Sequence, residues 1–174
     1  YLAQHFVTDY AKYICVLENP YILITEHKIN RMNDLKFILT QIAGEGRSIL
    51  LIAEDYDDSV LEALKANKMG GVLKVCAIKA PSFGEYRKLI LDDIAVLTGG
   101  SNISYDSGLE LSDVTMNMLG TCGKVIVNKT TTTIAKGNGK IEDINNRVSC
   151  IKNELSRVES DPSLNGSFLI NLHK

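Results

Sequence analysis

Hydrophobic positions in the first half of the chain follow the pattern of short strands. β-branched and aromatic residues at 12–17 and 21–25, separated by Glu18-Asn19-Pro20, predict two strands around a turn. Five aliphatic residues at 49–53 predict a strand covered on both faces. A further run at 72–79 predicts another strand.

Between these runs the apolar spacing changes to that of helices. Helices are predicted over 31–43, 59–69 and 85–98, each followed by a pair of nearby glycines. Ser59 and Glu62 match a capping box, which places the second helix start at Ser59. On the third helix we expect the inner face to hold Leu89, Ile90, Ile94 and Leu97.

In the last third of the sequence, the pattern predicts a brief helical turn over 112–119, then a hairpin and then a long helix. The hairpin pairs 124–128 with 131–135. After Gly137-Asn138-Gly139, apolar residues repeat at alternating steps of three and four, which is typical of an amphipathic helix with a clean seam: Ile141, Ile144, Val148, Ile151, Leu155 and Val158. We expect the fold class to be α/β with a mixed β-sheet core flanked by helices.

Composition narrows the class of protein. The 174 residues include 45% hydrophobic and 23% charged residues, as in an ordinary globular domain. A net charge of −2 without a basic run argues against a nucleic-acid partner. The longest aliphatic run is far shorter than a membrane span, so no membrane partner is expected. Since the chain begins at Tyr1, we expect it to be a piece of a longer protein.

Few residues carry recognisable chemistry. No phosphate-binding glycine motif is present, and the four cysteines and three histidines lack metal-ligand spacing, so no metal is expected. Cys76 and Cys150 are predicted to be buried thiols, and the histidines to lie at the surface. The acidic residues at 54–58 could bind a cation, but ending a strand and starting a helix is the simpler interpretation. Gly137-Asn138-Gly139 could hold an anion or simply connect a strand to a helix.

The two helices at 31–43 and 59–69 carry apolar residues that a core does not explain. On the second helix, Val60, Ala63, Leu64 and Asn67 share the predicted inner face, whereas Leu61 lies off that face. On the first helix, Met32, Leu39 and Ala43 flank the edge of the apolar stripe next to Lys36, and Phe37 lies on the far side. Several such residues on neighbouring helices are typical of a contact surface for a partner.

Five blocks of sequence, in order, resemble the apical domain of the group I (GroEL-type) chaperonins. They are ILLIAED at 49–55, GVLKV at 71–75, KAPSFGE at 79–85, LDDIAVLTGG at 91–100 and NKTTTTI at 128–134. The similarity runs without an obvious gap from Tyr1 to about Asp161. It implies an apical domain at 1–161 with the swivelling β/β/α fold, and a poorly ordered tail at 162–174 leading to an intermediate domain.

The resemblance also implies a role. The parent protein would form heptameric double rings, capture non-native polypeptides, bind a co-chaperonin lid and use ATP and magnesium. This family's ATP site lies in an equatorial domain, which this sequence does not contain, so the piece itself should need no cofactor and catalyse no reaction. The family occurs in the bacterial cytoplasm and in the mitochondrial or plastid matrix.

The family binds its partners in a groove between two helices that match 31–43 and 59–69, together with a nearby extended segment. Carried over position by position, the resemblance places substrate and co-chaperonin contacts on Tyr1, His5, Phe6, Lys36, Leu39, Leu61, Lys65 and Ala66. Exposed apolar surface can accept many sequences because hydrophobic burial is non-directional.

This chain departs from the family within that groove. Lys36 and Lys65 stand where the family has aliphatic residues, His5 where it has an aromatic one, and Phe37 replaces a usual proline. A lysine stem can cover apolar surface while its ammonium stays in water, so we expect a more cationic groove that favours acidic–apolar segments. The alternatives are a paralogue that acts as an interaction or signalling protein without foldase activity, and a free-standing α/β enzyme using the acidic residues at 54–58.

Overall fold

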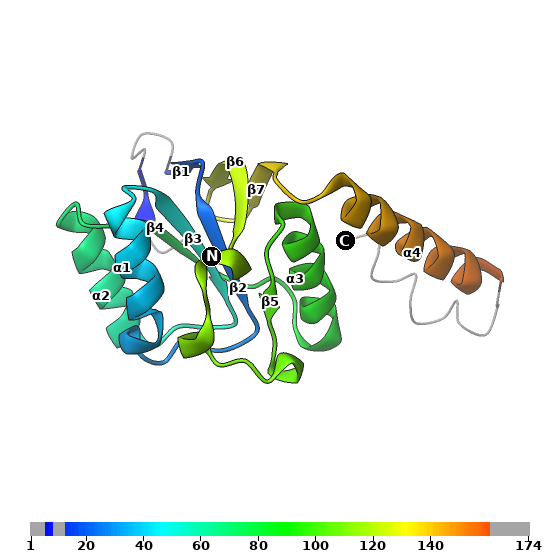
Figure 1. Ribbon diagram of the computed structural model, residues 1–174, viewed down its shortest axis with the longest axis horizontal. Helices are drawn as coiled ribbons and strands as arrows, with labels where there is room; N and C mark the ends of the chain where they lie inside the picture. Colours follow the sequence, from blue (N-terminus) through cyan, green and yellow to red (C-terminus); the bar gives the residue numbers. More distant parts are fainter. Residues whose placement is uncertain (1–5, 9–12, 161–174) are drawn as a thin grey trace. The chain divides into compact units, whose positions relative to one another are not determined.

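The computed structural model describes residues 6–8 and 13–160, which contain a seven-stranded mixed sheet and four α-helices (Figure 1). This agrees with the expected α/β class. The strands are β1 (Cys15–Glu18), β2 (Tyr21–Thr25), β3 (Ser48–Ala53), β4 (Lys74–Lys79), β5 (Asn102–Ile103), β6 (Gly120–Val127) and β7 (Thr132–Gly137).

The sheet runs in the order β1-β6-β2-β3-β4, with β5 added to β2 and β7 to β6. β2, β3, β4 and β5 are parallel, and β6 is antiparallel to β1, β2 and β7. The predicted hairpin is therefore β6–β7, in which Val125 pairs with Ile134. Parallel neighbours need helical crossovers, which is why the helices lie between β2, β3, β4 and β5 in the chain.

The α-helices are α1 (Lys36–Gly44), α2 (Asp58–Met69), α3 (Gly84–Thr98) and α4 (Ile141–Ser160), and short 3-10 helices lie at Met32–Leu35 (η2), Tyr105–Ser107 (η3), Leu111–Asp113 (η4) and Met116–Met118 (η5). α1 and α2 lie side by side on one side of the parallel strands, and α3 lies on the other side (Figure 1). The predicted turn over 112–119 corresponds to η4 and η5.

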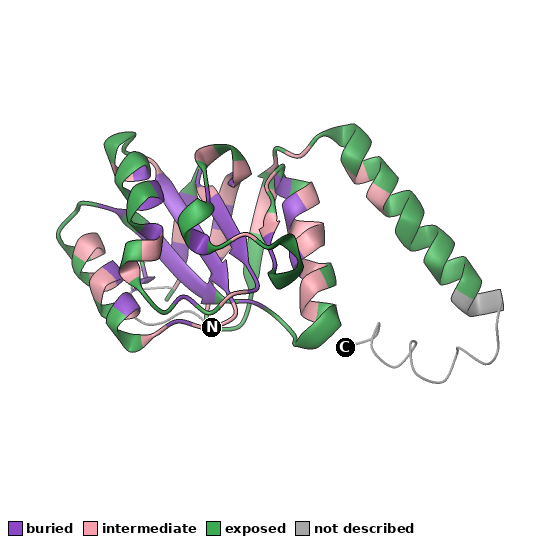
Figure 2. Cartoon of the chain, turned by 60° about the horizontal axis from the view of Figure 1, so that its bottom comes forward, coloured by how far each residue is buried: buried purple, intermediate pink, exposed green. Residues whose placement is uncertain are grey.

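The core follows the predicted strands closely. Every residue of β3 is buried, as its unbroken aliphatic run predicts. The strands form the buried centre in Figure 2, and the exposed positions lie on the outer sides of the helices. This burial supplies the main stabilisation of the fold, at roughly 25 cal/mol per Å² of apolar surface.

Two helix starts differ from the prediction. The first predicted helix begins as η2 and becomes α-helical only at Lys36. The second is capped by Asp57 rather than by Ser59, because the Asp57 carboxylate accepts hydrogen bonds from both the backbone N–H and the hydroxyl of Ser59. The strand predicted from Val72 begins at Lys74.

The predicted inner face of α3 is wrong for Leu89 and Leu97, whereas Ile94 is half-buried and packs against the core. The residues buried against the sheet are Leu91, Ala95 and Thr98, and Leu89 and Leu97 are exposed. Ile90, Ile94 and Leu97 instead border a shallow hollow of about 560 Å³ together with Ile134 of β7. A pattern alone cannot distinguish the face under the sheet from the face beside a hairpin, since both are apolar.

The chain divides into two units after Gly139. The second unit contains α4, which confirms the predicted long helix. Residues 162–174, predicted to be a tail, lie outside the described residues, so the boundary predicted at 161 stays a prediction. No helix in the described part of the chain combines the length and apolar character needed to cross a membrane.

Candidate functional site

α1 and α2 provide a candidate binding surface, because each helix buries one face against the sheet and leaves its other face accessible. Ile38 and Ile42 of α1 are buried, as are Val60 and Leu64 of α2. Each pair has the four-residue spacing that places two side chains on one helix face. A groove lies beside α1, and it is formed by α1 with the residues before it, by Asn67 of α2 and by the segment after α2.

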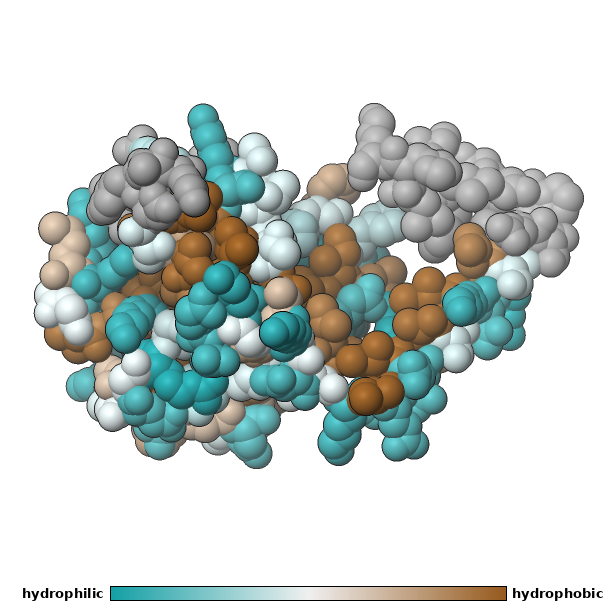
Figure 3. Space-filling model, turned by 90° about the horizontal axis from the view of Figure 1, so that it is seen from above, coloured by the Kyte–Doolittle hydropathy of each residue, from teal (hydrophilic) through white to brown (hydrophobic). Residues whose placement is uncertain are grey.

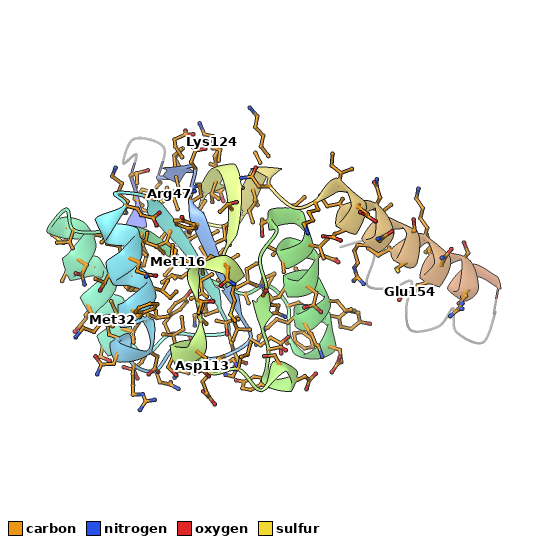
Figure 4. All side chains as sticks on the ribbon, in the orientation of Figure 1. Met32, Arg47, Asp113, Met116, Lys124 and Glu154 are labelled. Carbon is orange, nitrogen blue, oxygen red and sulfur yellow. The ribbon has the colours of Figure 1, made fainter. Side chains whose placement is uncertain are left out.

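The groove has a volume of about 370 Å³ and is lined mainly by apolar atoms. It lies between α1 and the C-terminal end of α2; Met32, which Figure 4 labels at the start of the first helical segment, is at its border. The complete lining is Met32, Asn33, Lys36, Leu39, Thr40, Ala43, Asn67, Val72 and Leu73.

The segment after α2 closes one end of the groove. The backbone N–H groups of Val72 and Leu73 both donate to the carbonyl oxygen of Asn67, at 3.0 and 3.2 Å. Gly71 makes this return possible with a φ of 71°, a conformation that favours glycine. As a result Leu73 is buried while the Val72 side chain stays 60% exposed at the groove.

Lys36 is the charged group of the groove. The polar residues Thr40 and Asn67 of the lining donate hydrogen bonds within their own helices. The Thr40 hydroxyl donates to the Lys36 carbonyl oxygen at 2.7 Å, and the Asn67 amide donates to the Ala63 carbonyl oxygen at 2.8 Å. Among the described residues the exposed Lys36 ammonium has no ion-pair partner. A positive charge at an apolar groove suits a segment that mixes acidic and apolar side chains.

The same two helices expose further apolar side chains. Phe37 is 59% exposed on α1, and Met69 is 76% exposed at the end of α2. The expectation that Phe37 lies away from the core is therefore confirmed. With Val72, which lines the groove, three large apolar side chains are exposed on α1, at the end of α2 and just after it.

Leu39 lies in the groove but is not the exposed residue that its position in the pattern predicts. Its side chain is only 6% exposed and belongs to the hydrophobic core. The physical reason is that α1 starts at Lys36, so Leu39 lies one turn after the buried Leu35 and beside Ile38. Leu39 therefore forms the floor of the groove.

The three predicted contacts on α2 lie outside the lining of this groove. Leu61 is half-buried and packs against the core, Lys65 is half-buried, and Ala66 is exposed. The structure thus brings together only Lys36 and Leu39 of the five predicted helix residues. Whether Leu61, Lys65 and Ala66 contact a partner stays a prediction.

In the extended segment the structure describes one predicted contact residue, Phe6, and its contact with a partner stays a prediction. Phe6, predicted to be a contact residue, is 1% exposed and belongs to the core. The Lys68 ammonium of α2 lies 5.6 Å from the centre of the Phe6 ring, which is a cation–π contact between this segment and α2. Burying a large aromatic side chain is more favourable in free energy than leaving it in water, which explains why Phe6 packs into the core. Tyr1 and His5 lie outside the described residues.

Sequence reasoning missed Val72, Leu73 and Met69 as parts of this surface. Val72 and Leu73 were expected to begin a strand. The signal that could have identified them is the apolar pair directly after Gly70-Gly71, where a chain leaving a helix must turn back across its end.

The acidic residues at 54–58 serve the fold, as the simpler interpretation held. Glu54 pairs with Arg87 at 2.6 Å and Asp55 with Lys79 at 2.7 Å. The Lys79 hydrogen bond and the Tyr56 N–H lower the pKa of the Asp55 carboxyl. Asp57 caps α2, and its bonds with Ser59 lower its pKa in the same way.

Gly137 and Gly139 lie where β7 leads into the chain beyond it, and the backbone there is too close to α3 for a side chain. A Cβ at Gly137 would collide with the Leu97 carbonyl group, and one at Gly139 with that of Val96. The Gly139 N–H donates to the Leu97 carbonyl oxygen at 3.0 Å. Close backbone approach to the end of α3 thus explains these glycines, and the connecting interpretation is the one that fits.

Two further predictions need correction. Cys150 is exposed on α4, whereas Cys76 is buried as predicted. His27, expected at the surface, is half-buried with its ring 4.3 Å from that of Tyr105, and its Nε2 has no hydrogen-bond partner among the described residues. His5 and His173 lie outside the described residues.

No protein-family model matches this chain.

Proposed function

We propose that this chain is the apical domain of a group I chaperonin, which captures non-native polypeptides and a co-chaperonin in the groove between α1 and α2. Five ordered sequence blocks resemble that family. Three of them fall on β3, on the β4–α3 connection and on α3 with its following glycines.

The observation that carries the proposal is the groove itself. It has a buried apolar floor at Leu39 and Leu73 and an exposed apolar wall at Val72. Unfolded chains share exposed apolar side chains rather than a sequence, and hydrophobic burial requires no particular direction. A groove between two helices can therefore accept an extended or helical segment of many different sequences.

Lys36 gives this groove its own preference. Its ammonium group attracts a carboxylate on the client, while its stem covers part of the apolar wall. We therefore expect peptides that mix acidic and apolar residues to bind better than purely apolar ones.

The experiment measures binding of two labelled peptides to the chain by fluorescence anisotropy. The peptides have equal length and apolar content, and one contains acidic residues in place of neutral polar ones. Val72→Glu should abolish binding of the apolar peptide without unfolding the chain, because this side chain is largely exposed.

Leu89→Glu on α3 is the matched control, since it also places a carboxylate at an exposed leucine but lies outside the groove. Equal binding by the two variants, or binding to neither peptide by the unaltered chain, would contradict the proposal.

The rest of the proposed role belongs to the parent protein. It would assemble into heptameric double rings, and its ATP and magnesium would bind in a different domain. The co-chaperonin would compete with clients for the same groove. Peptide displacement by an added co-chaperonin loop peptide tests that competition.

Lys36 also supports a second candidate, an interaction protein that kept the fold but lost general foldase activity. A charged groove would then select one acidic partner. Capture of the acidic–apolar peptide together with failure to suppress aggregation of several unrelated unfolded proteins would favour this candidate.

A further inference from the structure

The order of the parallel strands reverses at β2. β2, β3 and β4 lie side by side in chain order, whereas α3 returns the chain along the other face of the sheet and adds β5 to the opposite side of β2 (Figure 1). In open α/β sheets, ligands bind beyond the carboxyl ends of the strands at such a reversal. The carboxyl ends of β2 and β5 are therefore where the topology favours a second site.

A hollow of about 530 Å³ lies at this place. It is lined by residues that closely follow β2, between His27 and Asp34, and by residues that closely follow β5, between Tyr105 and Ser112. Asp113, which Figure 4 labels, ends η4 directly after the second group. A volume of this size is typical of pockets that hold a small molecule.

The hollow differs in character from the groove beside α1, because it is mostly polar. Of its nine lining residues only Leu111 is aliphatic. Figure 3 views the first unit from the opposite end, and hydrophobic residues are prominent on that face. The polar lining suits a charged small molecule better than an apolar segment of polypeptide.

His27 lies where the ends of the two strands are joined. The Thr25 hydroxyl donates to the Ile103 carbonyl oxygen at 2.9 Å and accepts a hydrogen bond from the His27 backbone N–H at 3.0 Å. The His27 ring packs against that of Tyr105, and its buried Nε2 has no hydrogen-bond partner in the described part of the chain. Most buried polar atoms have such a partner, so this nitrogen calls for one from outside the chain.

The segment after β2 presents one cation at the hollow. Ile29 is buried in an extended stretch, so its neighbours Lys28 and Asn30 are exposed together on the other side. Lys28 forms no ion pair within the described residues. Its charge adds only at longer range to the hydrogen bonds that lower the pKa of Asp55 and of Asp57, and both carboxylates have closer partners.

The segment after β5 presents one anion at the same hollow. Arg31 and Asp34 pair with each other at 3.3 Å, so their charges cancel. Glu110 forms a capping box with Asp113, but among the described residues no cation pairs with it. The hollow therefore offers the positive charge of Lys28 on one segment and the negative charge of Glu110 on the other.

We propose that this hollow binds a free α-amino acid with an aromatic side chain. Lys28 and His27 bind its carboxylate, and Glu110 binds its ammonium group. The ring of Tyr105, which is 61% exposed, packs against its side chain. A zwitterion satisfies both charges at once, whereas a simple anion is repelled by Glu110 and a simple cation by Lys28. The hollow shares no lining residue with the groove beside α1, so this inference goes beyond the proposed function.

The test is an NMR titration of the ¹⁵N-labelled chain with three related compounds: L-phenylalanine, N-acetyl-L-phenylalanine and L-phenylalanine amide. L-phenylalanine should shift the backbone amide signals of 27–31 and 105–112 in a saturable way, with a Kd of about 1 mM. The N-acetyl compound lacks the ammonium charge and the amide compound lacks the carboxylate. Each should bind about tenfold more weakly, because one charge-assisted contact is lost.

Two variants assign the two charges. Lys28→Gln should remove the preference for L-phenylalanine over its amide but keep the preference over the N-acetyl compound, and Glu110→Gln should do the reverse. Both side chains are exposed, so the fold should be retained. Lys129→Gln in the β6–β7 turn and Glu62→Gln on α2 are the matched controls, since both are exposed and lie outside the hollow. They should leave all three affinities unchanged.

Three results would overturn the proposal. The first is equal binding of the three compounds, and the second is the absence of saturable shifts up to about 10 mM. The third is a set of shifts confined to the groove beside α1, at Lys36 and Val72, because the amino acid would then occupy a different site. Capture of peptides by that groove is measured separately, so failure here leaves the proposed function intact.

Discussion

Lys36 and Leu39 line the same groove from one helix, three residues apart, yet the Leu39 side chain is only 6% exposed while Lys36 reaches solvent. The floor of the groove is therefore also part of the hydrophobic core. Substitutions at Leu39 act on folding, whereas substitutions at Lys36 act on what the groove attracts.

Leu39→Ala should destabilise the chain by about 2–5 kcal/mol, because it leaves a cavity in a packed core. Phe37→Ala, two residues earlier on the exposed side of α1, should change the free energy of unfolding by less than about 0.5 kcal/mol. Urea denaturation followed by circular dichroism measures both. Equal stability of the two variants would mean that Leu39 does not form the floor.

Lys36→Leu should strengthen binding of an apolar peptide and weaken binding of an acidic–apolar peptide. The lost charge attraction is exposed, so the second effect should be under about 1 kcal/mol, or roughly fivefold in affinity. Anisotropy titrations at low and high salt check this, because salt should erase the preference of the unaltered chain. Tighter binding of the acidic peptide by Lys36→Leu would contradict a cationic groove.

The strands were predictable because their signals are local. β2 begins directly after Pro20, and β3 is one unbroken aliphatic run, so pattern and boundary agree. The α4 seam was predictable for the same reason, since the repeat at three and four positions continues through the helix.

The inner face of α1 was predictable, because Leu35, Ile38, Leu39 and Ile42 share one helix face and all four are buried. The error was to treat Leu39 as a residue off the core, since it lies at the edge of that face next to the exposed Lys36. Val72 was missed because its position depends on the turn at Gly71.

Tyr56→Phe should destabilise the chain by about 1–3 kcal/mol. The buried hydroxyl oxygen of Tyr56 lies 2.9 Å from the carbonyl oxygens of both Leu51 and Ile78, and burial raises its pKa well above the usual range. Phenylalanine fills the same space but leaves these two carbonyl groups in β3 and β4 without that donor. Thermal unfolding checks this, with the exposed Tyr13→Phe as the near-neutral control.

Asp55 should contribute a small acid-sensitive stabilisation. The Lys79 hydrogen bond lowers the pKa of the folded-state carboxyl below its unfolded value of about 3.9. The contribution is therefore present above that pH and is lost as pH falls through the lower folded-state pKa.

Both side chains are substantially exposed, so solvent screening limits this contribution to about 1 kcal/mol. Asp55→Asn should lower the free energy of unfolding at pH 7 and match the unaltered chain near pH 2. Glu62→Gln on the exposed side of α2 is the control. A difference that grows toward acid pH would reverse the assigned sign.

The native chain should expose one rapidly reacting thiol. All four cysteines lie in the described residues; Cys150 is exposed on α4, whereas Cys15, Cys76 and Cys122 are buried in the sheet. The hydrogen bond with Cys15 and burial raise the pKa of the Cys76 thiol, and burial raises that of Cys122, so both stay protonated and unreactive. Labelling with a chromogenic disulfide reagent should give one fast equivalent, lost in Cys150→Ser, and the remaining thiols only after unfolding in urea. Two or more fast equivalents would show that the sheet opens far more readily than its packing implies.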